Sequence, residues 1–117
     1  STKLDFPNDK TIHQLFEEQT IRTPNRIALI IDDQQLTYEE LNFRANHLAL
    51  TLIEKGVKPN SIVGLISERS FSAIIGILGI LKAGGAYLPI DKKDNYLINQ
   101  IDICMKKYNI FWDILFL

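Results

Sequence analysis

The stretch that most constrains the fold is SIVGLIS, residues 61–67. Its apolar residues are consecutive instead of alternating, which is typical of a strand covered on both faces in the middle of a parallel sheet. The following ERSFSAIIGILGILKAGG is apolar nearly all round until Lys82, which predicts a buried helix that Ser70 can cap. AYLPI then returns as a strand. Strand, helix and strand predict a βαβ unit over residues 61–90 with a right-handed crossover.

A helix and a hairpin are expected ahead of this unit. Thr11 and Gln14 have the spacing of a capping box at the start of TIHQLFEEQTIR. Pro24 should end that helix, because a proline pushes the residue before it out of the α region. RIALII and LTY flank DDQQ, which predicts two strands joined by a turn at Asp32 and Asp33.

The next helix has the clearest pattern in the chain. Thr37 and Glu40 form a second capping box, and Gly56 is placed to stop the helix. Its inner stripe repeats at helical spacing through Leu41, Ala45, Leu48 and Leu52. Together the elements predict an α/β fold in which a partial parallel or mixed sheet carries flanking helices.

Charge and composition exclude several classes of partner. Thirteen basic and fourteen acidic residues leave a net charge of -1, which creates no field for nucleic acid or an anionic membrane. The single cysteine, Cys104, cannot form an internal disulfide, which is typical of a reducing compartment. No signal peptide is visible, and no apolar run approaches the ~20 residues of a membrane span. We therefore expect a cytoplasmic protein.

Gly84 and Gly85 raise the question of whether they bind phosphate. A phosphate-binding glycine loop follows a strand and precedes a helix, where free N–H groups and the helix dipole face the anion. Here the glycines follow a helix, where exposed carbonyls make the local field negative. We expect a glycine cap at the helix end, with Lys82 complementing the dipole.

Other polar residues favour structural over chemical roles. His13 and Glu17 stand four residues apart and could hold a metal from one helix face, but neither they nor His47 have further ligands at a suitable spacing. Asp32 and Asp33 are adjacent turn residues that share one environment, whereas an acid–base pair needs two different environments.

Two segments could bind a partner. SERS, residues 67–70, lies where a buried parallel strand ends and a helix begins, the edge at which open α/β sheets bind ligands. Arg69 could face an anion there, although a lone arginine at a strand end is more often a cap or a surface ion pair. The apolar NIFWDILFL, residues 109–117, is either a docking strip for a partner or a membrane, or a segment that packs against the domain or is exposed and disordered.

With LTYEEL at residues 36–41 and LKAGGAYLPID at residues 81–91, the sequence resembles the N-terminal part of nonribosomal peptide synthetase adenylation domains. The two stretches are similar to the first two signature motifs of that family. The resemblance makes residues 1–10 a linker-like arm, as from an upstream condensation domain, and residues 11–91 the N-terminal portion of an adenylation domain. Residues 92–117 are expected to be a divergent tail.

The resemblance implies the parent chemistry. Such enzymes use ATP and Mg²⁺ to convert an amino acid into its aminoacyl adenylate, then load it onto the phosphopantetheine thiol of a carrier domain. The family's phosphate loop, amino-acid pocket and catalytic lysine lie downstream of the two motifs. The motifs present here carry scaffold residues, so no catalytic, cofactor-binding or metal-binding residue is assigned, and this chain is expected to be inactive alone.

Residues 92–117 leave two explanations open. One is a reading frame shifted or interrupted just after Asp91, which would give a non-native sequence. The other is a diverged helix, because apolar residues fall near helical period at positions 97, 98, 101, 105, 108 and 112.

Two other functions remain open, and one physical consequence follows. The chain could be a noncatalytic interaction module, or part of another adenylate-forming ligase such as an acyl-CoA synthetase. A strand with the pattern of SIVGLIS is normally paired with neighbouring strands on both edges and covered by other elements on both faces. An incomplete domain would expose apolar surface and a sheet edge, so we expect self-association.

Overall fold

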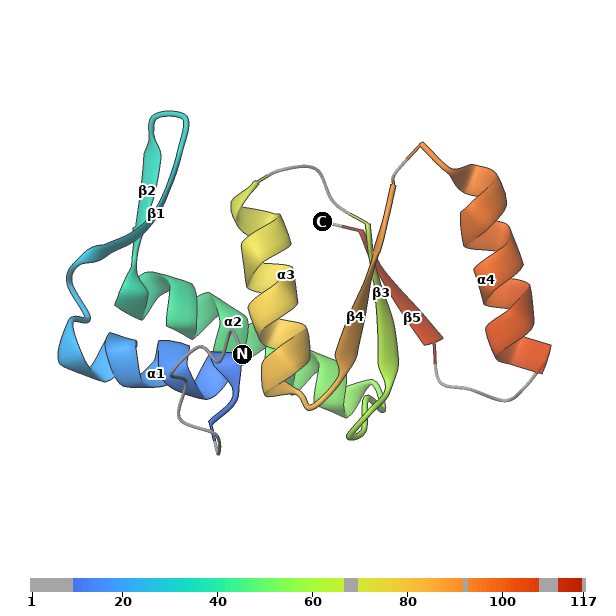
Figure 1. Cartoon of the computed structure of the whole chain (residues 1–117), viewed down its shortest axis with the longest axis horizontal. Helices are drawn as coiled ribbons and strands as arrows, with labels where there is room; N and C mark the ends of the chain where they lie inside the picture. Colours follow the sequence, from blue (N-terminus) through green and yellow to red (C-terminus); the bar gives the residue numbers. More distant parts are fainter. Residues whose placement is uncertain (1–9, 67–69, 92, 108–111, 117) are drawn as a thin grey trace, which may run out of the picture.

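The computed structural model describes residues 10–66, 70–91, 93–107 and 112–116, so all but the last residue of the expected arm at residues 1–10 lies outside the described part. Figure 1 shows how the elements are arranged. In chain order they are α1 (Ile12–Arg22), β1 (Ile27–Ile31), β2 (Gln34–Thr37), α2 (Tyr38–Glu54), β3 (Ile62–Ile66), α3 (Phe71–Lys82), β4 (Ala86–Ile90), α4 (Asn95–Lys107) and β5 (Trp112–Phe116).

A three-stranded parallel sheet organises one end of the molecule. Its strand order is β4-β3-β5, so β3 has hydrogen-bonded neighbours on both edges. Ile62 is aligned with Ala86 of β4 and with Trp112 of β5. Figure 1 shows α3 and α4 on opposite sides of this sheet. The predicted βαβ unit and the α/β class are confirmed, and the cover on both faces explains the unbroken apolar run of β3.

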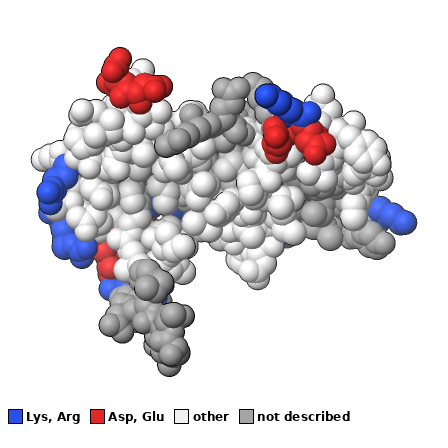
Figure 2. Space-filling view, turned by 45° about the horizontal axis from the view of Figure 1, so that its top comes forward, with Lys and Arg blue, Asp and Glu red and all other residues white. Residues whose placement is uncertain are grey.

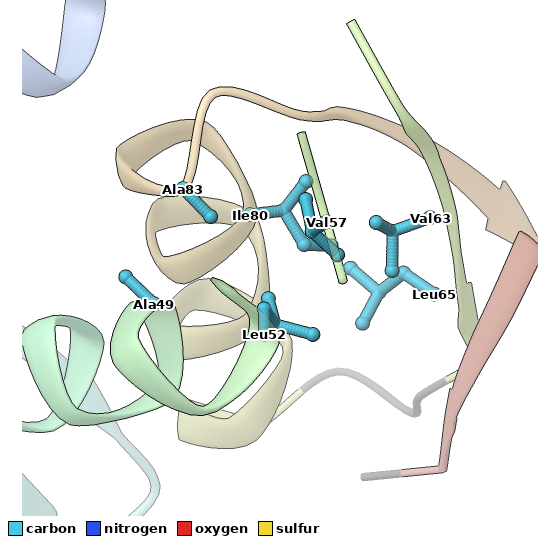
Figure 3. Close-up of a cluster of buried hydrophobic side chains, with 7 residues drawn as sticks. All are labelled: Ala49, Leu52, Val57, Val63, Leu65, Ile80 and Ala83. Atoms are coloured by element: carbon cyan, nitrogen blue, oxygen red, sulfur yellow. The ribbon is translucent and has the colours of Figure 1, made fainter. Parts of the chain in front are cut away.

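The core lies between the sheet and the helices α2 and α3. Val63 and Leu65 share one face of β3, because side chains alternate along a strand, and Figure 3 shows both beside Leu52 of α2 and Ile80 of α3. Leu52, Val63 and Ile80 are 0% exposed. On the opposite face, Ile66 is 2% exposed. Apolar burial on both faces therefore holds β3 in the centre of the sheet.

Helices α2 and α3 approach closely because one residue on α3 has no side chain. A Cβ atom built on Gly79 would lie 2.7 Å from Cδ2 and 3.0 Å from Cβ of Leu48 on α2. Non-bonded contacts that short essentially do not occur between carbon atoms, so any larger residue at position 79 would force either the Leu48 side chain or the helices to shift.

Both predicted capping boxes are present. The Gln14 N–H donates to Thr11 Oγ1 at 3.2 Å, and the Thr11 N–H donates to Gln14 Oε1 at 2.9 Å. In the second box, the Glu40 N–H donates to Thr37 Oγ1 at 3.1 Å, and the Thr37 N–H donates to Glu40 Oε1 at 3.0 Å. Each box satisfies N–H groups that a helix leaves unpaired at its start. The expected glycine stop is also present, since Gly56 follows the end of α2 with φ 108°.

Ser70 stands at the N-cap of α3, as expected from the sequence. Its side chain does not make the capping hydrogen bond to the first turn of the helix. The first turn is closed instead by the backbone, where the Ala73 N–H donates to the Ser70 carbonyl at 3.2 Å. The start of α3 therefore depends less on its cap than the starts of α1 and α2 do.

The predicted hairpin is formed by β1 and β2. These strands pair antiparallel up to Ile31 and Gln34, so Asp32 and Asp33 are the two loop residues. Asp32 has φ 54°, a left-handed conformation that aspartate tolerates better than most residues. A second buried cluster, made by Leu36, Leu41, Ala45 and Leu78, anchors the hairpin base to α2 and α3.

Residues after Asp91 form a helix and a strand. The helical alternative matches α4, but it does not extend to position 112, because Trp112 begins β5. β5 pairs in parallel with β3 over five aligned positions, from Ile62–Trp112 to Ile66–Phe116. Pairing with a strand nearly fifty residues earlier is a long-range contact, which explains why the local apolar period did not reveal it.

Candidate functional site

The two glycines of LKAGGAYLPID end α3. The Gly84 N–H donates to the Leu81 carbonyl and the Gly85 N–H to the Ile80 carbonyl, both at 3.0 Å. This pair of bonds is a Schellman motif, and Gly84 supplies the left-handed residue that it needs, with φ 87°. The predicted role as a helix cap is confirmed.

The same glycines also join α3 to the loop before β3. The Asn60 N–H donates to the Gly84 carbonyl at 2.9 Å, and the Ala86 N–H donates to the Ser61 carbonyl at 2.8 Å. A Cβ on Gly85 would lie 3.1 Å from that Ser61 oxygen. Backbone groups therefore occupy the space beside the glycines, and the motif acts here as a structural junction.

Lys82 lies in the last turn of α3, but it does more than complement the dipole. Its Nζ lies 2.9 Å from Glu17 Oε2 on α1. The Lys82 side chain is 5% exposed and that of Glu17 is 43% exposed. The ion pair therefore joins α1 to α3, two helices that are far apart in sequence. Glu17 is therefore an ion-pair partner of Lys82 and not a free ligand beside His13.

Neither histidine lies in a cluster of metal ligands. His13 Nε2 is 3.3 Å from Thr11 Oγ1, at the start of its own helix. His47 is exposed on α2. Over the ranges that the structure describes, no group of three or more histidine, cysteine, aspartate and glutamate residues gathers closely enough to hold a metal ion.

The carboxylates near the hairpin and α2 have structural contacts. Asp32 and Asp33 form the turn between β1 and β2. The hydrogen bonds that Glu40 accepts from the Thr37 backbone and side chain hold the pKa of its carboxyl below the ordinary value of 4.5, and the nearby Arg44 charge acts in the same direction. The Glu40 carboxylate therefore accepts hydrogen bonds that cap the start of α2.

Several surface hollows in the described part of the chain could hold a small molecule, and two of them adjoin the start of α2. One, of about 290 Å³, is apolar and contains no carboxylate, imidazole or thiol; it is lined by Ile12, Phe16, Ala28, Leu29, Tyr38, Leu41, Ile74, Ile77 and Leu78. The other, of about 460 Å³, is lined by Glu39, Glu40, Phe43 and Arg44 at the start of α2. Neither combines a nucleophile with a base, so neither has the groups for acyl or phosphoryl transfer.

On the face that Figure 2 draws, the charged side chains are also dispersed. Figure 2 shows lysine, arginine, aspartate and glutamate side chains in small separate groups, with wide uncharged areas between them. The predicted ligand position at SERS lies mostly outside the described part of the chain, because residues 67–69 are not described and Arg69 is one of them. The anion-facing role of Arg69 stays a prediction.

Sequence reasoning missed an apolar stripe on the outer face of α2. Phe43, Leu50 and Ile53 are 72%, 61% and 50% exposed. Their spacing of seven and three residues places them on one side of the helix, away from the buried stripe that contains Leu41 and Leu52. The signal was present in the sequence as a second period of apolar residues within the same helix.

No helix in the part of the chain that the structure describes has the length and hydropathy needed to cross a bilayer.

The fold and the junction together define the chain as a portion of an α/β domain with helices on both sides of a parallel sheet. A family model described as "AMP-binding enzyme" matches residues 16–106. The chain therefore belongs to the AMP-binding enzyme family, and the match includes both motifs and most of α4.

Relatives and solved structures agree with this assignment. The chain is 55% identical to Gramicidin S synthase 1 of Brevibacillus brevis over 91 residues, which are 78% of this chain and 8% of that protein. It resembles the AMPPNP-bound nonribosomal peptide synthetase FmoA3 with a TM-score of 0.73 and 34% identity over 84% of this chain and 10% of that one. The NpsA N-terminal subdomain of Klebsiella oxytoca matches with a TM-score of 0.73 and 25% identity over 91% of this chain and 31% of that one.

These comparisons identify the region of the family that the chain represents. It matches the N-terminal part of adenylation domains in nonribosomal peptide synthetases, as the two motifs implied. It spans less than a tenth of the length of Gramicidin S synthase 1.

Proposed function

We propose that this chain is the structural N-terminal portion of an amino-acid-activating adenylation domain, and that it does not catalyse adenylate formation by itself. The observation that carries the proposal is the Schellman junction at Gly84 and Gly85, which belongs to the family match and yet directs its N–H groups to helix carbonyls. A phosphate would need those donors free.

The parent reaction would use ATP and Mg²⁺ and would load the amino acid onto the phosphopantetheine thiol of a carrier domain. The support is the family description and the similarity to peptide synthetases. Condensation and carrier domains are the corresponding partners, and the cytoplasm is the corresponding location. No residue of this chain is assigned to ATP, metal or thiol.

Amino-acid-dependent exchange between pyrophosphate and ATP tests this proposal. The expected result is exchange no faster than in a protein-free sample, with any of the twenty amino acids. Gramicidin S synthase 1, measured under the same conditions, is the positive control for the assay. Turnover by this chain alone would overturn the inactive assignment.

We also propose that residues 92–107 continue the domain. The family match runs to residue 106, and a match that covers 91% of the chain must extend beyond residue 91. The parallel register of β5 with β3 supports the same reading for residues 112–116. A frame interrupted just after Asp91 would have given a sequence with no reason to satisfy either comparison.

A noncatalytic interaction module is the second candidate function. It is favoured by the pairing of β3 on both edges, with β4 and with β5, because a short protein that folds and functions by itself needs a central strand with partners on both sides. The two candidates differ in behaviour: a self-sufficient module should be monomeric and melt cooperatively, whereas an adenylation-domain portion should associate through its sheet edge.

A further inference from the structure

In the part of the chain that the structure describes, the sheet β4-β3-β5 has two outer strands with no further strand beside them, and their outer edges are not equivalent. We propose that the outer edge of β5 is a binding site for one more parallel strand, supplied by the part of an AMP-binding N-terminal subdomain that this sequence does not contain, and that the outer edge of β4 is closed to such a strand. This inference rests on the proposed function.

The backbone of β4 shows which of its groups face outward. The Ala86 N–H donates to the Ser61 carbonyl, so the Ala86 backbone faces β3. Backbone groups alternate sides along a strand, so Leu88 and Ile90 also face β3, while Tyr87 and Pro89 face away from it. Proline has no N–H, which leaves Tyr87 as the one outward donor between positions 86 and 90. Proline is found on sheet edges for this reason.

The outer edge of β5 has no such interruption. Because the Ser61 carbonyl faces β4, the alternating backbone of β3 directs Ile62, Gly64 and Ile66 toward β5. In a parallel ladder, the backbone N–H and C=O of each of these β3 residues form hydrogen bonds with the two β5 residues on either side of its aligned partner. The aligned partners themselves, Trp112, Ile114 and Phe116, therefore direct their N–H and C=O groups away from β3. Each of the three carries a donor and an acceptor.

The winding of the chain also points to β5 as the edge that continues. The connection through α3 crosses one face of the sheet and the connection through α4 crosses the other, as Figure 1 shows. The second strand along the chain, β4, pairs with one edge of the first strand, β3, and the third strand, β5, pairs with the other edge of β3. This strand order is the beginning of a doubly wound sheet. In such sheets, later strands are added beyond the third one, which here is β5.

The length of the NpsA N-terminal subdomain indicates where the strand that pairs with the outer edge of β5 would come from. This chain corresponds to 31% of the NpsA N-terminal subdomain, so most of such a subdomain consists of other segments. Parallel sheets are normally buried, which makes an unpaired edge of three donors and three acceptors unfavourable. A strand from those other segments would satisfy both the hydrogen bonds and the family relationship.

The test is co-expression of the full chain with the part of the Gramicidin S synthase 1 adenylation domain that follows the region matched here. Amide hydrogen exchange then compares the chain with and without this partner. We expect exchange to slow by about tenfold or more at Trp112, Ile114 and Phe116, with no change at Tyr87. Slowing at Tyr87 with none on β5 would overturn the proposal, and so would the absence of a complex.

Two matched proline variants test the same edge by binding. Ile114→Pro removes an outward N–H from β5, and Tyr87→Pro removes the corresponding N–H from β4. We expect Ile114→Pro to abolish co-purification and Tyr87→Pro to retain it, with circular dichroism confirming that each variant is folded. The reverse pattern contradicts the proposal. If Ile114→Pro unfolds the chain, amide exchange in the unsubstituted chain decides.

The outcomes separate this inference from the proposed function. Pyrophosphate exchange by the chain alone would contradict the proposed function whatever binds to β5. An inactive chain that forms no complex, or whose complex protects β4, would contradict only the assignment of the β5 edge.

Discussion

At the scale of single residues, position along a helix decides what a glycine does. The same glycines placed before a helix would present free N–H groups to an anion. Placed after α3, Gly84 and Gly85 instead donate to the Leu81 and Ile80 carbonyls. Direction of the chain was therefore enough to predict their role from the sequence.

Gly84→Ala should destabilise the fold. An alanine at φ 87° brings its Cβ too close to the backbone, which costs about 1–2 kcal/mol. Chemical denaturation measures the change, with Asn46→Ala on the exposed surface of α2 as the control. Equal stability of the two variants would show that the Schellman turn does not need its left-handed residue.

Glu40 should contribute a pH dependence of stability. Its folded-state pKa lies below 4.5, so its stabilisation is present above that value and is lost as the pH falls through the folded-state pKa. Thermal melts of the unsubstituted chain from about pH 6 down to about pH 3, a range that includes the ordinary pKa of glutamate, should show stability falling with the pH.

The substitution Glu40→Gln isolates this effect. Glutamine retains the capping geometry without a titrating group, so part of the acid-dependent loss should disappear. Glu39→Gln changes the adjacent carboxylate and leaves the capping box intact, so it should keep the part of the pH dependence that comes from Glu40. Identical profiles for the two variants would contradict the role given to Glu40.

At the scale of elements, local and long-range structure differ in how far the sequence predicts them. The capping boxes at Thr11 and Thr37, the Asp32–Asp33 turn and the glycine stops were predictable because each involves residues within a few positions of one another. The central place of β3 followed from its unbroken apolar run. β5 was not predicted, because its pairing partner lies nearly fifty residues earlier.

The candidate site shows the same limit. The spacing of His13 and Glu17 is local and visible, but the contact that uses Glu17 joins α1 to Lys82, which is 65 residues away. The exposed stripe of α2 was visible as a pattern, yet its exposure depends on which face packs against α3. Sequence patterns give faces and caps, while assignments of partners require the packed structure.

The ion pair between α1 and α3 provides a prediction at this scale. Glu17→Gln leaves the Lys82 ammonium, 5% exposed, without a carboxylate partner, and should cost about 1–2 kcal/mol. Glu18→Gln removes the exposed pair between Glu18 and Lys10 and should change stability by less than about 0.5 kcal/mol. Denaturant titration of both variants gives the comparison, and equal losses would contradict it.

At the scale of the whole molecule, a closed core coexists with an open sheet. The cluster between β3, α2 and α3 is buried, which allows the chain to fold. The outer edges of β4 and β5 have no further strand beside them in the described part of the chain. A small parallel sheet of this kind is stable enough to form and exposed enough to associate.

Self-association is therefore expected for the isolated chain. Light scattering coupled to size-exclusion chromatography should give a mass that rises with concentration above the 13.4 kDa of the monomer. The Ile114→Pro variant should lower that mass if the β5 edge mediates the contact, and Tyr87→Pro is its matched control. A constant monomer mass with a sharp cooperative melt would favour the self-sufficient module instead.

The central claim is that this chain provides framework for a nucleotide-using domain and holds no nucleotide itself. Isothermal titration calorimetry of the full chain with ATP and Mg²⁺ tests it most directly, with FmoA3, which has been solved in an AMPPNP-bound form, as the binding control. The account predicts no saturable heat for this chain. Stoichiometric binding of ATP would contradict it.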